Sequence, residues 1–564
     1  MEGIHRAAEG YAYPAARVRP LGLPAAMPAL LALAVVFGTL LAATALVSVA
    51  WYDDVYQLRF WPPVADAYFD VAPFVVALTI ASLIRLLPPF LLATIPGGLA
   101  GYFLALKAPA AVRRWGLFLV LAAWVLTVPR TIGTLHLFSG NPGASWFPWM
   151  IRDSTGGDFV VLFYNALPPI ALGVYSALRG EFLGLVWPDS SGTRSRRFVR
   201  EALPRGAVGA AFGVLLAWAS ATFEGWVVEL YGGQAALPIG SYIQTQLNNI
   251  GGATLAAAAI LMALGMLVAV FLGFLGFTWL VRALSRLVAS SPAVAASRQP
   301  WLSRVSMGIT AFAFVFLVVS SLIPISLAAV FSLNAGDDPL LFDGWSTRWY
   351  ANPGVQSGAF QTVGIFDDPD YWRFLLGSLG LSAVTAFAAA PLGVSAAAAV
   401  FGLPPRSRSA VRATLYMGFV VPLIMFAWMT YFVRALAVTS FPGLDVVGVS
   451  AAVLVFLSQL PLAIGISFVV AAASGSWRQA VALRSGPFVW IRPMVAGAFV
   501  SIAFLLTSYG LFTEYSQTAY IFGIVGKKIA TPLFDAALVV LSACSLAALL
   551  AGWVLLRDQE GFRF

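Results

Sequence analysis

The sequence predicts an all-α integral membrane protein with about twelve transmembrane helices, arranged as two parallel six-helix repeats. Two observations predict this fold class. Of the 564 residues, 60% are apolar and only 10% are charged, whereas a soluble domain carries roughly 25% charged residues. The apolar residues also gather in repeated runs of about 20, the length that crosses a hydrocarbon core of about 30 Å.

Twelve apolar runs follow one another along the chain, each bounded by charged or turn-forming residues. The first run is too long for a secretory signal, and no small-residue cleavage pattern follows it. A basic segment at 285–304 separates two sets of six, so we expect a first half over 1–284, a linker over 285–304 and a second half over 305–564. The expected spans are 26–50, 73–106, 115–137, 158–180, 205–223, 250–284, 305–333, 373–402, 411–436, 447–473, 494–511 and 533–556.

The charges predict an orientation for these spans. With the N-terminus inside, the segments on the cytoplasmic side hold 24 Lys and Arg against 7 Asp and Glu. The rest of the chain holds 33 − 24 = 9 basic and 24 − 7 = 17 acidic residues. Because basic loops remain cytoplasmic, both termini are expected inside. The net charge of +9 is therefore a sign of topology. No basic patch interleaved with aromatic residues indicates a nucleic-acid partner.

The two halves share an ordered set of proline, glycine and acidic positions, and the register holds to within about a residue. An even number of spans in each half makes such repeats parallel, with an axis along the membrane normal, an arrangement common in transporters. The matching positions are Pro96 and Gly98 with Pro391 and Gly393, Val128-Pro129 with Val421-Pro422, Leu167-Pro168 with Leu460-Pro461, and Pro204, Gly209 and Glu224 with Pro493, Gly497 and Glu514.

The cytoplasmic segment between the fourth and fifth spans, 179–205, reads RGEFLGLVWPDSSGTRSRRFVREALPR. It resembles a cytoplasmic loop of the inner-membrane permease subunits of ABC importers, which carries a Glu-Ala-Ala group, then a glycine and then a Leu-Pro dipeptide. Leu203-Pro204 matches the dipeptide, and Phe198 matches an aromatic residue usually found six positions before the proline. The glycine position falls on Ser191, beside Gly192.

The second half carries a weaker version of the same loop. Pro493 takes the proline position, and the Glu-Ala-Ala positions fall near Ser474 and Gly475; a register ending at Pro487 is an alternative. In the first half the Glu-Ala-Ala positions, 185–187, hold Leu-Val-Trp. The proline frame of the motif is therefore present in both halves, and its acidic residue is absent from both.

Other stretches resemble one branch of that family. The segment FEGWVVELYGGQAALPIGSYIQTQ at 223–246 and the tripeptide at 141–143 are similar to the first permease subunit of spermidine/putrescine-type importers. The stretches IPISLAAVFSLN at 323–334 and GWSTRWY at 344–350 are similar to the start of the second subunit. Fusion of both permeases into one chain is more typical of the ferric-iron and thiamine importers.

The resemblance implies a permease in the cytoplasmic membrane of a prokaryote, importing a small solute that an extracytoplasmic binding protein delivers. The loops at about 181–204 and 474–493 would dock on a separate ATPase dimer, and the permease itself would need membrane lipid but no cofactor and no metal. A polyamine-like cation is the favoured solute, with ferric iron, thiamine and phosphonates as alternatives. A basic linker that merely obeys the charge rule would explain the basic residues of 179–205 equally well.

The few charged residues near the spans suggest a pathway. Glu224 and Glu514 occupy matching positions at the outer ends of the fifth and eleventh spans, where acids facing a central pathway would suit a cation; acids that simply face water are an equal alternative. Arg85 either lines the external mouth or snorkels to the membrane interface. Trp349 and Tyr350 are expected to anchor the chain at that interface.

Two other classes remain open from the sequence. The chain has no GxxxxGK[ST] phosphate loop, so ATP hydrolysis is expected on another subunit, and it has no cluster of Cys and His. An ion-coupled secondary transporter also has paired six-helix halves, but such carriers place ionisable residues within their spans, and these spans are nearly bare of them. A permease-like protein without transport activity is the third class, which the missing Glu-Ala-Ala residues keep open.

Overall fold

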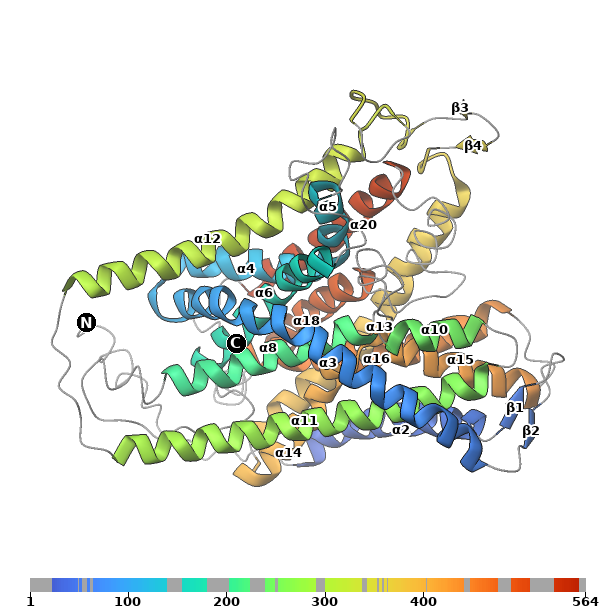
Figure 1. The fold of residues 1–564 in the computed structure, drawn as a ribbon, viewed down its shortest axis with the longest axis horizontal. Coiled ribbons are helices and arrows are strands. Elements are labelled where there is room, and N and C mark those ends of the chain that lie inside the picture. Colours follow the sequence, from blue (N-terminus) through green and yellow to red (C-terminus); the bar gives the residue numbers. More distant parts are fainter. Residues whose placement is uncertain are drawn as a thin grey trace.

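The structure is a computed structural model. Its described residues form mainly helices, together with two short β-hairpins (Figure 1). The residues that it describes are 23–48, 50–52, 58–60, 64–138, 155–179, 202–223, 239–248, 252–290, 300–336, 342–351, 355–357, 360–362, 364–401, 403–440, 447–474, 488–507 and 532–556. The expectation of a helical, multi-pass membrane protein is confirmed by this architecture and by the apolar helices below.

The elements before the expected linker are mostly long helices. They are α2 (Leu23–Ser48), the hairpin of β1 (Ala50–Tyr52) and β2 (Leu58–Phe60), α3 (Val64–Tyr102), the π-helix η1 (Phe103–Lys107), α4 (Ala110–Val125), α5 (Thr127–Phe138), α6 (Thr155–Arg179), α8 (Leu203–Phe223), α10 (Ile239–Asn248) and α11 (Ala253–Ser290).

A similar series follows the linker. It consists of α12 (Pro300–Phe331), the hairpin of β3 (Val355–Ser357) and β4 (Phe360–Thr362), α13 (Pro369–Phe401), α14 (Pro405–Val420), α15 (Leu423–Ser440), α16 (Val447–Ser474), α18 (Phe488–Thr507) and α20 (Pro532–Leu556). The helices α11 and α12 extend into the predicted linker from both sides, so only 291–299 of it lies outside the described residues.

Among the described residues, ten helices are long and apolar enough to cross a membrane. Two further pairs, α4 with α5 and α14 with α15, pass the same test together but are sharply bent, which gives up to twelve crossings if each pair is one span. The bent pairs occupy the predicted spans 115–137 and 411–436. The sequence predicted one continuous span in each of these two regions and did not predict the bends.

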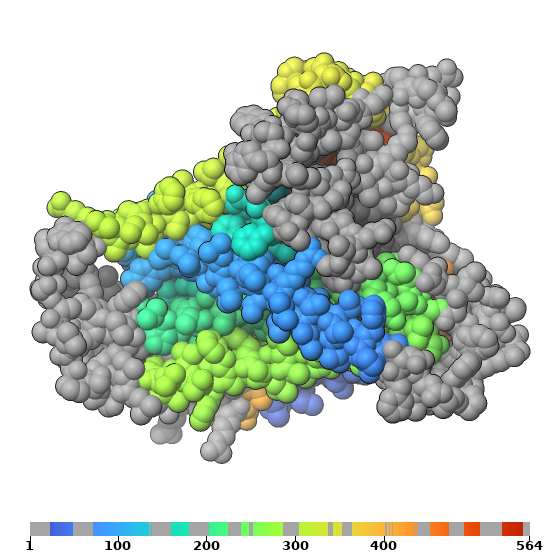
Figure 2. All heavy atoms as spheres, in the orientation of Figure 1, coloured from blue at the N-terminus to red at the C-terminus, as the bar shows by residue number. Residues whose placement is uncertain are grey.

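The outer surface of the bundle is apolar. Figure 2 shows α3, α11 and α12 side by side along one face, and large hydrophobic side chains on each of them are exposed, among them Ile84, Leu272 and Phe312. An apolar surface of this extent is unsuited to water. On helices long enough to span a bilayer, it is the surface that faces lipid.

Small residues let the helices approach closely inside the bundle, as is typical of membrane helices. Gly173 of α6 and Gly209 of α8 face each other, and a Cβ added to Gly209 would lie 2.3 Å from the Gly173 carbonyl oxygen. After the linker, Gly393 of α13 packs in the same way on Ser467 of α16. These contacts hold the centre of each group of helices together.

The first helix of each half packs against the other half. α2 contacts α13, α15 and α16, all of which follow the linker, while α12 contacts α3, α4, α5 and α6, which precede it. Figure 1 shows α12 lying over α4 and α5. The two halves are thus interlocked and do not pack side by side as separate bundles.

Candidate functional site

The two bent helix pairs, α4 with α5 and α14 with α15, are the most distinctive feature of the described helices. α4 and α5 meet at 73°, and α14 and α15 meet at 82°. Proline explains both breaks, because it has no N–H to donate and its ring clashes with the carbonyl four residues earlier. Pro129 lies in the first turn of α5, and Pro422 directly follows Val421, whose extended backbone (φ −77°, ψ 115°) is the conformation that proline imposes on the residue before it.

Arg130 follows Pro129 and points into the protein, where its side chain is only 1% exposed. Its Nη2 donates to Oδ1 of Asn165 in α6 at 3.0 Å and lies 3.5 Å from the Asn165 carbonyl oxygen. Its Nη1 lies 3.4 Å from Oγ of Ser321 in α12. The guanidinium therefore joins α5 to α6 and to α12, which follows the linker.

The partners of Arg130 are all neutral. Asn165 also donates from Nδ2 to Oγ1 of Thr131 at 3.0 Å, which completes a cluster of four polar side chains (Arg130, Thr131, Asn165 and Ser321) from three helices. Within the described part of the chain, no carboxylate pairs with this guanidinium, and its Nε has no hydrogen-bond partner. A buried charge is costly unless an opposite charge accompanies it, so this cluster is an unusual one to find inside a membrane protein.

The second half has a different arrangement at the matching positions. Leu423 follows Pro422 where Arg130 follows Pro129, so the second break carries no cation there. Ser458 precedes Pro461 by three residues, as Asn165 precedes Pro168. The neighbouring Gln459 is 0% exposed, and among the described residues neither its amide oxygen nor its amide nitrogen has a hydrogen-bond partner. The two broken spans are therefore alike in geometry and unlike in charge.

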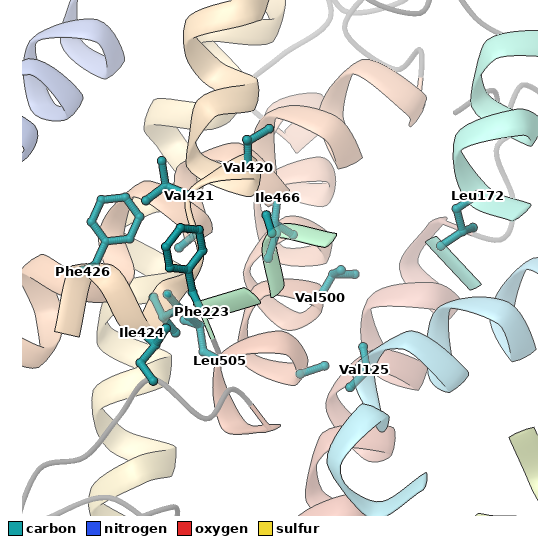
Figure 3. Packing of buried hydrophobic residues seen from close by; sticks show 14 of the residues in the cluster. Val125, Leu172, Phe223, Val420, Val421, Ile424, Phe426, Ile466, Val500 and Leu505 are labelled. Atoms are coloured by element: carbon teal, nitrogen blue, oxygen red, sulfur yellow. The ribbon is translucent and has the colours of Figure 1, made fainter. Parts of the chain in front are cut away.

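Apolar and aromatic side chains fill the contact between the halves. Trp124 of α4 meets Phe504 of α18 edge-on, with ring centroids 5.2 Å apart, and Phe212 of α8 meets Tyr416 of α14 at 5.8 Å. Figure 3 shows part of the same core, where Val421 and Ile424 on either side of Pro422 belong to one cluster with Phe223 and Leu505. Helices on the two sides of the linker thus meet through large apolar surfaces.

A side-chain hydrogen bond also joins helices on the two sides of the linker. Trp428 of α15 donates from Nε1 to Oε1 of Gln244 in α10 at 3.1 Å. Near it, an edge contact between Phe37 of α2 and Phe426 of α15, with centroids 5.1 Å apart, holds α15 against α2. The second bend is thus held to its neighbours mainly by aromatic packing, whereas the first is held by the hydrogen bonds of Arg130.

A turn that follows α12 packs against the end of this helix. The Trp349 indole is buried and donates from Nε1 to the Asn334 carbonyl oxygen at 2.7 Å, with the Arg348 guanidinium 4.4 Å from its ring centroid. Tyr350 shares a 2.7 Å hydrogen bond with Ser332, and burial raises the pKa of its hydroxyl. The prediction that Trp349 anchors the chain at the membrane interface is wrong, because this indole is inside the fold and stabilises the turn.

Of the eight residues predicted to couple to an ATPase, four lie outside the described part of the chain, namely Ser191, Gly192, Phe198 and Gly475. The other four lie at the ends of described helices or inside them. Leu203 and Pro204 begin α8, and Leu203 is exposed. Pro493 lies within α18, five residues after its first residue, and Ser474 is the last residue of α16. The described helices α8 and α18 thus reach into the segments 181–204 and 474–493, which were predicted as coupling loops.

Of the predicted pathway residues, the structure describes Arg85 alone. Arg85 lies within α3, is half-buried and takes part in at least one polar or electrostatic contact. Glu224, which follows the last residue of α8, and Glu514 lie outside the described residues. The predicted acidic pathway therefore stays a prediction.

Sequence reasoning missed three buried charged residues. The expectation that the spans are nearly bare of ionisable groups overlooked Arg130 in α5, Arg412 in α14 and Asp535 in the first turn of α20, which are 1%, 4% and 1% exposed. A signal was present in each case, because all three are charged residues inside a predicted apolar span. For Arg130 the adjoining Pro129 was a second signal, since it marks a place where a span can break.

The described residues hold no group of three or more His, Cys, Asp or Glu side chains that could bind a metal ion. The chain matches no protein-family model and no curated protein. The function must therefore be argued from the architecture and the site.

Proposed function

We infer that the chain is a transmembrane permease in which two parallel six-helix repeats are fused, and that it imports a small solute across the cytoplasmic membrane of a prokaryote. A separate ATPase dimer on the cytoplasmic side supplies the energy, and an extracytoplasmic binding protein supplies the solute. In this reading each bent pair is one crossing, so the repeats comprise α2 to α11 and α12 to α20.

The observation that carries this proposal is the reciprocal packing of the two halves. The first crossing of each half contacts the second, third and fourth crossings of the other half, as α2 does with α13, α15 and α16 and α12 does with α3, α5 and α6. The third crossing is bent in both halves, at 73° and 82°. Two unrelated bundles would have no reason to share both features, whereas two copies of one unit related by an axis through the membrane would share them.

The helix contacts inside each half support the same repeat. The fourth and fifth crossings approach each other at Gly173 and Gly209 in the first half, and at Ser467 and Gly497 in the second. One predicted equivalence shifts by a residue: Gly98 faces open space, and its neighbour Gly97 makes the contact with α6 that corresponds to Gly393 with α16. A shift of this size lies within the register that the sequence matches allow.

The same contacts suggest how ATP could drive transport. The proposed coupling segments connect α6 to α8 and α16 to α18, and the helices of each pair pack against each other. A displacement of either segment by a closing ATPase dimer would therefore be carried into the centre of the bundle. Because α2 and α12 each pack against the opposite half, movement of one half also moves the other, and the two halves rock together.

The experiment replaces residues 185–201 by a Gly/Ser segment of equal length, which leaves α8 intact from Leu203. The variant is expected to insert into the membrane and to lose its ATPase partner, measured as Mg-ATP hydrolysis that co-purifies with the tagged chain. The matched control replaces 291–299, the segment between α11 and α12, and is expected to keep the partner. Equal hydrolysis with both variants would contradict the docking role.

A specific observation favours a second candidate, an ion-coupled carrier. Such carriers use ionisable residues and broken helices within the membrane, and both Arg130 and Asp535 are buried inside apolar helices. The two candidates differ in their energy source. Uptake that collapses with a proton ionophore while ATP is maintained would favour the carrier, and uptake that follows ATP would favour the permease.

A further inference from the structure

The first broken span combines two features that attract negative charge. A helix N-terminus carries a partial positive charge, and transporters with discontinuous helices aim such ends at anionic groups of the solute. The 12-residue helix α5 begins at Thr127, immediately after the 73° bend. Arg130 lies in its first turn, so a full positive charge is added to the partial charge of the helix end.

The second, independent feature is the lack of a counter-charge around Arg130. Within the described residues no carboxylate pairs with this guanidinium, and its Nε is a buried donor with no acceptor. The neutral partners use their own donors elsewhere, because the Thr131 and Ser321 hydroxyls donate to backbone carbonyl oxygens and the Asn165 amide donates to Thr131. The positive charge is therefore balanced by no group of the cluster, and an anion would supply the missing charge.

The existing contacts of Arg130 are weak enough to be exchanged. Two of its three contacts, with Ser321 Oγ at 3.4 Å and with the Asn165 carbonyl at 3.5 Å, are at the long end of hydrogen-bond distances. Both acceptors are neutral, and an anionic oxygen forms a shorter and stronger bond with a guanidinium. An anion that reached the bend would therefore displace them.

We propose that the bend between α4 and α5 is a binding site for an anionic group of the transported solute, with Arg130 as its cation. The proposal rests on the proposed function in taking the ligand to be the transported solute. It assigns that solute a phosphate, sulfate or carboxylate group, opposite in charge to the polyamine-like cation that the sequence resemblance suggested. The second bend, with Leu423 in place of Arg130, lacks the site.

The test measures saturable binding of labelled phosphate, sulfate and succinate, with spermidine as the cationic probe, to the purified full chain in phosphatidylcholine nanodiscs. We expect at least one anion to bind, and Arg130→Gln to lower its affinity by about tenfold or more, the loss of one charge-assisted hydrogen bond. Arg434→Gln removes a half-buried cation from α15 and is the matched control, with binding unchanged.

Asn165→Asp separates a binding role from a purely structural one. It places a carboxylate where Oδ1 now lies 3.0 Å from Arg130 Nη2, so that the chain neutralises its own cation. We expect this variant to keep or raise the thermal stability and to lose anion binding. If the cluster only holds α5 against α6, the Asn165→Asp variant would gain stability and bind anions as the parent chain does. This result would overturn the proposal.

Two further outcomes would also overturn the proposal. One is binding of spermidine with no binding of any anion. The other is competition by phosphatidylglycerol that abolishes solute binding, which would assign the site to a lipid headgroup.

Failure of the anion-site proposal is distinguishable from failure of the permease proposal. Co-purifying ATP hydrolysis depends on 185–201 and not on Arg130, so the Arg130→Gln chain keeps its ATPase partner if the permease proposal holds. Anion binding without any ATPase partner would leave this site standing and exclude the permease.

Discussion

Replacement of Gly133 by alanine tests whether the two halves are interlocked through α5 and α12. A Cβ added at Gly133 would lie 1.7 Å from the carbonyl oxygen of Pro324 in α12 and 2.3 Å from its carbonyl carbon. Real Cβ atoms essentially never approach a neighbour within 3.0 Å, so the helices must separate by at least 3.0 − 1.7 = 1.3 Å. The obstacle is backbone, which has no alternative rotamer to adopt.

The separation has a second consequence, because Arg130 and Ser321 lie one turn before Gly133 and Pro324 on the same helices. Their 3.4 Å contact would lengthen beyond hydrogen-bond distance. Overpacking of a close contact costs about 1–3 kcal/mol, and a hydrogen bond to a charged group contributes about 1.5–3 kcal/mol. We therefore expect Gly133→Ala to destabilise the protein by about 3 kcal/mol or more.

The assay is thermal unfolding of the full chain in nanodiscs, compared with Gly98→Ala as the control. Nothing lies within 4 Å of a Cβ at Gly98, and alanine is the better helix former by about 1 kcal/mol, so the control should be as stable as the parent chain or slightly more so. If both variants unfolded at the same temperature as the parent, the close approach of α5 and α12 would be refuted, and with it the interlocked arrangement.

Two further mutational predictions concern contacts between distant segments. Trp349→Phe should lower the free energy of unfolding by about 1–3 kcal/mol, because it leaves the buried Asn334 carbonyl without its 2.7 Å donor; an unchanged melting temperature would argue against the buried turn. A double-mutant cycle with Trp428→Phe and Gln244→Leu should give a coupling free energy of about 0.5–1.5 kcal/mol across their 3.1 Å hydrogen bond, and strictly additive effects would show that α10 and α15 do not meet.

The span positions could be predicted from the sequence because hydrophobic length and charge asymmetry act locally. The two bends could not be predicted, although Pro129 and Pro422 are evident in the sequence. Other prolines, such as Pro168 in α6 and Pro461 in α16, lie within helices that continue past them. Whether a proline breaks a span or is accommodated depends on the helices packed around it, and these come from distant parts of the chain.

The Arg130 cluster escaped prediction for a similar reason. Its partners Asn165 and Ser321 are 35 and 191 residues away, and neither stands out as a polar residue in an apolar run. A single arginine inside a predicted span was the available signal, and a functional role is the first hypothesis for such a residue. The predicted pathway acids, by contrast, were placed by the repeat register alone, which says nothing about what their side chains contact.

The central claim, that this chain is a permease driven by a separate ATPase, is tested most directly by ATP hydrolysis that co-purifies with it. The tagged full chain is isolated from the membranes of its own host, and Mg-ATP hydrolysis is measured before and after replacement of 185–201. The account predicts hydrolysis with the parent chain and its loss in the variant. Solute uptake that persists in membranes from which no ATP-hydrolysing partner can be isolated would contradict it.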